Sequence, residues 1–138
     1  MDRQFSVREV AALLGVSDDT VRRWGESGRL PLTPASSGRL TADGVDLAAL
    51  AQELGAGSAL AEAFPASRAS ARNRITGIIT RVVKDGVMAQ VELQAGPFRI
   101  VSLISREAAD DLDLQPGVVA TASVKATNVT IEIPEDRA

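Results

Sequence analysis

The fold of the C-terminal half is decided by residues 75–104, which read ITGIITRVVKDGVMAQVELQAGPFRIVSLI. This stretch holds three runs rich in β-branched residues, a composition typical of strands. The runs cover 75–83, 87–93 and 98–104, and the tight turns between them are Lys84-Asp85-Gly86 and Ala95-Gly96-Pro97. Strands joined by such short turns are predicted to pair in antiparallel fashion.

The chain beyond residue 104 adds one helix and more strand. Ser105 is suited to cap a short helix through Leu112, and Gln115-Pro116-Gly117 turns the chain again. A further β-rich run covers 118–133. The C-terminal half is therefore predicted to be an OB-like barrel of about five strands with one short helix.

Residues 5–54 show helical spacing instead of strand alternation. Val7, Val10, Ala11 and Leu14 line one face of a first helix, which Gly15 ends. Ser17 can cap a second helix that ends at Gly28, residues 30–39 form a loop or short hairpin, and Thr41 can cap a third helix to Leu54. Two helices joined by a three-residue turn form a helix-turn-helix pattern.

The predicted fold class is α+β with two domains: a mainly α, winged helix-turn-helix domain and an OB-like barrel. The expected boundaries are 1–54 for the first domain, 55–67 for a linker that is partly helical, and 68–138 for the barrel.

The composition excludes several classes of function. The 138 residues contain no His and no Cys, which removes the commonest general base, every thiolate nucleophile and the usual ligands of transition metals. Asp110, Asp111 and Asp113 cluster at a helix end, where they are interpreted as a solvated face. We expect no enzyme activity and no metal-cation site.

Charge and the N-terminus bear on partners and location. The formal net charge is −3, so any contact with DNA must come from local placement of basic residues. Polar, periodic sequence follows Met1 directly, and no run of eighteen apolar residues occurs. A cytoplasmic protein without a membrane partner is expected.

Residues 5–54 carry one family pattern. Residues 5–17, FSVREVAALLGVS, together with Thr20-Val21-Arg22-Arg23-Trp24 and Gly28-Arg29-Leu30-Pro31, resemble the MerR-type winged helix-turn-helix. The resemblance implies that the second helix enters the major groove and that a basic wing follows it. The side chains implied to face DNA are Thr20, Arg22, Arg23, Arg29 and Arg39.

Three features of this half depart from the MerR pattern. Leu40 stands where the wing usually carries an aromatic residue, residues 1–54 contain no Lys, and their six Arg are outnumbered by eight Asp and Glu. A solvated helix face at Arg22 and Arg23 therefore stays open as the alternative.

The C-terminal half carries a second pattern. Ser70-Ala71-Arg72-Asn73 and Val124-Lys125-Ala126-Thr127-Asn128-Val129 resemble the Mop module, the molbindin-like molybdate-binding barrel also called a TOBE domain, over about residues 68–134. The resemblance implies molybdate or tungstate as bound oxyanion. Its implied ligands are Ser70, Arg72, Asn73, Ser105, Lys125, Ala126 and Thr127.

The residue types agree with that ligand. A tetrahedral dianion offers only acceptor oxygens, so its site needs hydroxyls, amides and one or two cations. Read singly, Ser70 could instead be a turn cap, Asn73 could bond its own backbone, and Lys125 could be solvated.

The two resemblances together imply a molybdate-responsive DNA-binding transcriptional regulator, similar in function to regulators of the ModE type. Those regulators usually carry two barrels per chain, whereas this chain has one, and the anion of Mop proteins often lies between barrels. Sites shared by neighbouring subunits of a homo-oligomer, either a dimer or a hexamer, are implied. The alternatives are a molybdenum storage or buffering protein without sequence-specific DNA binding, and a DNA-binding protein that uses the barrel only to oligomerise.

Overall fold

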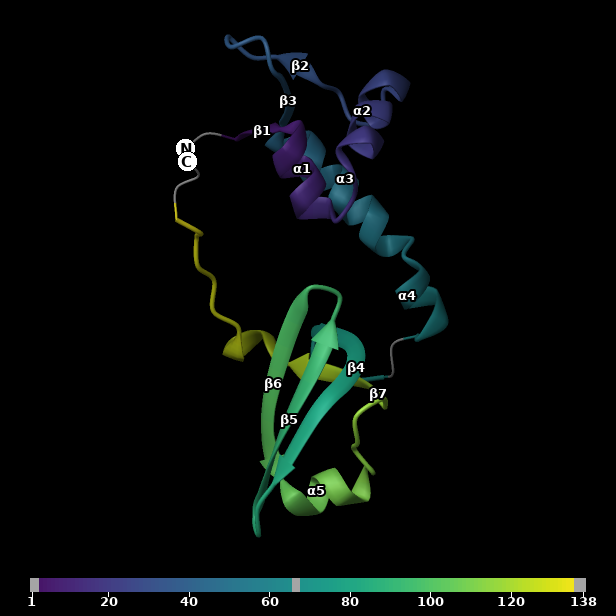
Figure 1. Cartoon of the computed structure of the whole chain (residues 1–138), viewed down its shortest axis with the longest axis vertical. Coiled ribbons are helices and arrows are strands. Elements are labelled where there is room, and N and C mark those ends of the chain that lie inside the picture. The colour runs from purple at the N-terminus through teal and green to yellow at the C-terminus, as the bar shows by residue number, and fades with distance from the viewer. Residues whose placement is uncertain (1–2, 66–67, 136–138) are drawn as a thin grey trace. The chain divides into compact units, whose positions relative to one another are not determined.

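The computed structural model describes residues 3–65 and 68–135. The chain divides into two compact units, Met1–Ala63 and Phe64–Ala138, and their elements are labelled in Figure 1. Helices and strands are both present, which confirms the mixed α and β class. None of the helices in 3–65 and 68–135 combines the length and the apolar character needed to cross a membrane.

The N-terminal unit is built mainly from helices, with a small sheet at one end. In chain order its elements are β1 (Gln4–Ser6), α1 (Val7–Leu14), α2 (Asp18–Ser27), β2 (Thr33–Pro34), β3 (Leu40–Asp43), α3 (Gly44–Ala56) and α4 (Ala59–Ala63). The sheet has the order β1-β3-β2, and both pairings are antiparallel.

Local signals explain the first two helices. Ser6 accepts a hydrogen bond from the amide of Glu9, whose carboxylate accepts one from the amide of Ser6, so a capping box starts α1. Gly15 ends α1 in the left-handed region, at φ 68°, which a glycine adopts without strain. Ser17 then caps α2 by accepting from the amide of Thr20 at 3.1 Å. The predicted end of the first helix at Gly15 and the predicted cap and end of the second, Ser17 and Gly28, are confirmed.

The helices and β3 enclose one aliphatic core. Its buried residues are Val7, Val10, Ala11, Val21, Leu30, Ala42, Leu47 and Leu50. Trp24 packs against this cluster and is partly buried, in agreement with its interpretation as a core residue. Arg29 covers the outer side of the Trp24 ring, with its guanidinium carbon 5.6 Å from the ring centre.

The third helix starts later than predicted. Asp43 is its N-cap and accepts from the amide of Val45 at 3.0 Å, whereas Thr41 lies in β3 opposite Ser6 and Thr33. The prediction for Thr41 was wrong because β1 and β3 are distant in sequence and their pairing leaves no local signal. The helix continues to Ala56, and the boundaries predicted for the domains and the linker stay predictions.

The C-terminal unit is a curled antiparallel sheet with one short helix. Its elements are β4 (Asn73–Lys84), β5 (Met88–Ala95), β6 (Phe98–Ser105), α5 (Arg106–Asp111), β7 (Val119–Val124) and the 3-10 turn η1 (Ala126–Asn128). The strand order is β6-β5-β4-β7. Ile79, Val91 and Leu93 form the buried cluster, and partly buried residues such as Ile100 and Ile104 pack against it.

Strand β4 has two partners along its length. From Asn73 to Ile78 it pairs with β7, and from Ile78 to Lys84 it pairs with β5, with an irregularity between Ile79 and Arg81. This change of partner curls the sheet in Figure 1. Gly77 lies at the change, where its backbone passes directly over the carbonyl group of Gln94.

The last predicted strand is shorter than expected. The β-rich run over 118–133 forms β7 only to Val124, followed by η1, and residues 129–135 belong to no strand. The described part of this unit therefore has four strands instead of about five. The alternation of Val129, Ile131 and Ile133 suits a strand, but these residues lack a partner strand in the described chain, and Ile131 is 85% exposed.

Charged groups join α5 to the end of β4. Nζ of Lys84 lies 2.6 Å from Oδ1 of Asp110, and Nε of Arg106 lies 3.7 Å from Oδ2 of the same carboxylate. The hydrogen bond from Lys84 holds the pKa of Asp110 below its usual value of 3.8.

We expect Gly77→Ala to lower the free energy of unfolding of the C-terminal unit by about 2 kcal/mol, because backbone must move to admit the new methyl group. An added Cβ would overlap the Gln94 carbonyl and lie 3.0 Å from Cα of Ala95. Urea unfolding measures the effect. The control is Gly86→Ala, since a Cβ at Gly86 meets no atom within 4 Å; equal losses for the two variants would contradict the close approach.

The lowered pKa of Asp110 predicts a pH dependence of stability. A carboxyl with a depressed folded pKa contributes stability that is present above its unfolded value and is lost as the pH falls through the folded value. Stability should therefore fall as the pH drops below about 4, and Asp110→Asn should flatten that part of the curve. Thermal melts across pH check this, with Asp111→Asn as the control on the same helix because Asp111 has no ion pair among the described residues.

Candidate functional sites

Strand pairing brings the two predicted oxyanion segments to one end of the sheet. Asn73 opens β4, Val124 closes β7, and the two residues are register partners. The side-chain amide of Asn73 also donates to the carbonyl oxygen of Val124 at 3.1 Å. Arg72 immediately precedes this pair and Lys125 immediately follows it, so two cations from distant parts of the chain flank the same rung of the ladder.

The remaining groups at this end are exposed polar groups. Ser70 and Arg72 lie in the irregular segment before β4, and both are exposed. Lys125 is the N-cap residue of η1, and Ala126 and Thr127 form the turn, where the amide of Asn128 donates to the carbonyl of Lys125 at 2.9 Å. Neither Arg72 nor Lys125 has an ion-pair partner within residues 3–65 and 68–135. Two free cations and two hydroxyls suit an anion with several acceptor oxygens.

Asn73 has a different role from its neighbours. Its amide is half-buried and bonded to Val124, so it holds the two segments together instead of presenting a donor to solvent. In the described geometry Asn73 is a positioning residue for Arg72 and Lys125.

Ser105 lies at the other end of the sheet. It pairs with Met88 on β5, next to the rung that joins Ala89 to Lys84. Asn73 and Lys84 are the two ends of β4, which is roughly 35 Å of strand at about 3.3 Å per residue. The structure therefore does not bring Ser105 together with the other predicted ligands within one chain.

The surroundings of Ser105 are acidic. Its hydroxyl oxygen accepts from the amide of Ala108 and so caps α5. A hollow of about 570 Å³ beside it is lined by Arg106 and by the carboxylates of Glu107, Asp110 and Asp111. Asp85 also lies on this side of the sheet, and hydrogen bonds from the amides of Met88 and Val87 lower its pKa. One arginine against several carboxylates is unsuited to a dianion.

The predicted DNA-facing residues differ in how strongly they are bound by hydrogen bonds and ion pairs within the chain. Arg23 donates to Thr20 at 3.3 Å, and Thr20 is part of the cap of α2. Arg29 is paired with Glu53 at 3.1 Å and covers Trp24. Arg22 has only a long contact of 3.9 Å with the exposed Asp19. Arg39 has no ion pair within the described part of the chain.

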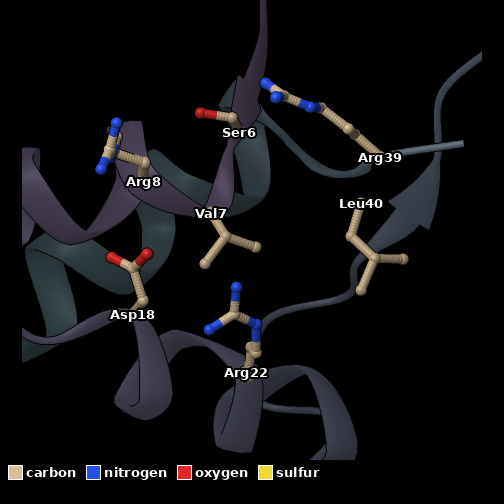
Figure 2. Close-up of a pocket in the computed structure, with 7 residues that line it drawn as sticks. All are labelled: Ser6, Val7, Arg8, Asp18, Arg22, Arg39 and Leu40. Atoms are coloured by element: carbon tan, nitrogen blue, oxygen red, sulfur yellow. The ribbon is translucent and has the colours of Figure 1, made fainter. Parts of the chain in front are cut away.

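Arg22 and Arg39 share an open hollow of about 550 Å³ with Arg8, a residue that the sequence analysis did not consider (Figure 2). The three arginines come from α2, from the chain before β3, and from α1. Arg8 lies in the first turn of α1, where the helix dipole disfavours a cation, and this placement is the signal from which it could have been found.

The described residues contain no grouping of Asp and Glu that could hold a metal ion.

Comparison with known proteins concerns the C-terminal unit. The family model described as TOBE domain matches residues 69–131. Molybdenum-pterin-binding protein 3 of Clostridium pasteurianum is 40% identical over 63 residues, which are 45% of this chain and 93% of that protein. The chain belongs to the TOBE family. Its TOBE segment contains both cationic segments and all of β4 to β7.

Other relatives are longer or are known as structures. Molybdenum-pterin-binding protein MopB of Rhodobacter capsulatus is 36% identical over 76 residues, which are 54% of this chain but only 28% of that protein. The molybdate-binding protein from Sporomusa ovata is 33% identical, with a TM-score of 0.47, over 49% of this chain and 100% of its own. This chain thus spans about a quarter of the length of the Rhodobacter protein.

Proposed function

We propose that this protein binds molybdate or tungstate through its TOBE segment. The observation that carries the proposal is the rung between Asn73 and Val124, which sets Arg72 and Lys125 at one end of the sheet. The relatives named above are described as molybdenum-pterin-binding or molybdate-binding proteins. Their names support the same ligand here.

The chemistry of the donors agrees with this ligand. Molybdate carries two negative charges on four acceptor oxygens, and Arg72 and Lys125 supply two positive charges beside the hydroxyls of Ser70 and Thr127. Ala126 can contribute only through its backbone. Since molybdate is slightly larger than sulfate, a donor set held at fixed spacing can select by size. We expect no catalysis, because the chain has no His or Cys to act as general base or thiolate nucleophile beside these groups.

The site is proposed to be shared between chains. Within one chain Ser105 cannot reach the anion held by Arg72, and the carboxylates beside Ser105 disfavour a dianion there, so the shared site is proposed without Ser105. The C-terminal unit also exposes large apolar side chains, with Phe98 and Leu103 each 66% exposed and Ile133 72% exposed. Burial of these side chains by a neighbouring subunit would favour association. The proposal is therefore a homo-oligomer, a dimer or a hexamer, with anions bound between barrels of neighbouring subunits.

The N-terminal unit supports a regulatory function. It has two capped helices joined by a short turn, followed by an antiparallel strand pair with Arg39 beside it. This order of elements favours a winged helix-turn-helix that binds double-stranded DNA. The function proposed for the whole chain is a molybdate-responsive transcriptional regulator in the cytoplasm, in which anion binding changes the geometry of the DNA-binding units.

Storage or buffering of molybdenum is the second candidate. The excess of acidic over basic residues in 1–54 favours it, because net negative charge weakens attraction to DNA. It predicts tight anion binding without a sequence-specific footprint on DNA.

Melting the purified protein with and without molybdate tests the ligand. At about one hundred times Kd, a ligand stabilises by about 2.7 kcal/mol, so the melting temperature of the C-terminal unit should rise by roughly 10 °C or more. Arg72→Ala and Lys125→Ala should each remove most of this rise. The matched control is Arg81→Ala, which deletes a charge from the middle of β4, where Arg81 is paired with Glu92 at 3.6 Å. If molybdate still raised the melting temperature of Arg72→Ala and Lys125→Ala as it does for the wild type, the assigned site would be disproved.

Fluorescence anisotropy of duplex DNA, titrated with the protein in the presence and absence of molybdate, tests the regulatory function. We expect the Kd for DNA to differ by roughly fivefold or more between saturating molybdate and none, because coupling free energies between sites are typically of this order. Lys125→Ala should bind DNA but lose the difference. The same Kd in both conditions would refute the coupling, and no specific binding in either would favour storage.

A further inference from the structure

A hollow lined by three arginines is present in the N-terminal unit. The hollow of Figure 2 is bordered by the first turn of α1, by α2 and by the start of β3. Arg8, Arg22 and Arg39 line it from these three places, with Val7 and Leu40 as apolar wall. Asp18 supplies the one carboxylate among the residues that line it. Half of the six arginines of this acidic unit therefore border a single hollow.

The placement of Arg8 is unfavourable for folding alone. The first turn of a helix carries a partial positive charge, and Glu9 and the Ser6 cap already serve it. A cation in that turn is repelled by the dipole. A bound anion would offset this cost.

The three guanidinium groups are also available to bind an anion. Neither Arg8 nor Arg39 has an ion pair among the described residues, and the only one of Arg22 is the 3.9 Å contact with Asp19, whose side chain is 88% exposed. In Figure 2 the guanidinium of Arg22 points into the hollow toward Val7, and the side chain of Arg39 extends toward Ser6. Arg29, in contrast, is held by Glu53.

We infer that this hollow binds a backbone phosphate of duplex DNA. The inference deepens the proposed DNA-binding function and rests on it. Three planar donors from three elements suit the tetrahedral oxygens of a phosphodiester. Such a contact reads no sequence; it fixes how deep and at what angle α2 lies in the major groove. Arg8 thereby joins the DNA-facing residues, and α1 contributes to binding beside α2.

The test measures binding of the full-length protein to a mixed-sequence duplex of roughly 20 base pairs, by anisotropy between about 50 and 200 mM salt. Arg8→Ala and Arg39→Ala should each weaken binding about tenfold on any sequence and lower the slope of log K against log salt by about 1. Asp18→Asn should tighten binding several-fold, an effect that misfolding cannot imitate. The control is Arg3→Ala, which removes an exposed arginine outside the hollow.

The outcomes distinguish failure of the proposed phosphate site from failure of the proposed DNA binding. If DNA binds but Arg8→Ala and Arg39→Ala match Arg3→Ala, and Asp18→Asn has no effect, the hollow is refuted and the proposed DNA binding stands. If wild-type protein binds no duplex at low salt, the DNA part of the proposed function fails and the inference fails with it. A parallel NMR titration with inorganic phosphate then identifies the source of the anion. Shifts at Val7, Arg8 and Arg39 without DNA binding would mean that the hollow takes a free oxyanion, which overturns the assignment to DNA.

Discussion

The change of partner along β4 is the constraint that organises the C-terminal unit. Because β4 pairs first with β7 and then with β5, the sheet curls, and the start of β4 meets the end of β7. The rung between Asn73 and Val124 then joins two cationic segments that lie about fifty residues apart in sequence. The passage at Gly77 permits the curl, since only a residue without a side chain fits over the Gln94 carbonyl. Backbone pairing, more than side-chain packing, positions the candidate ligands.

Charge placement organises the N-terminal unit. Its net charge is negative, yet its cations are unevenly distributed: Arg29 is neutralised by Glu53, and Arg8, Arg22 and Arg39 gather at one hollow. An acidic protein can thus present a local basic surface while the rest of it repels a polyanion, which favours one orientation of approach. The positions of the individual arginines are therefore a better indication of the binding partner than the net charge.

Many helix ends and turns could be predicted from the sequence because the residues that determine them are local. Ser6, Gly15 and Ser17 fix their own helix ends, and Asp85-Gly86 and Gly96-Pro97 fix the turns between strands. The errors arise where partners are remote. The role of Thr41 depends on β1, and the end of the last strand depends on whether a neighbour exists for residues 129–133. The contribution of Arg8 depends on a hollow made by three elements, which helical periodicity cannot reveal. The hydrogen-bond donors of the candidate site could be recognised in the sequence. That Ser105 lies at the opposite end of the sheet from them could be found only from the strand register.

The segment after η1, residues 129–133, has a consequence for aggregation of the protein. Its sequence Val-Thr-Ile-Glu-Ile alternates like a strand, and both β6 and β7 are edges of the sheet with unpaired backbone groups. A segment of this kind can add to an edge strand of a second copy, and the charge of Glu132 opposes that pairing. Covering these edges in an assembly would therefore protect the protein against aggregation through strand pairing.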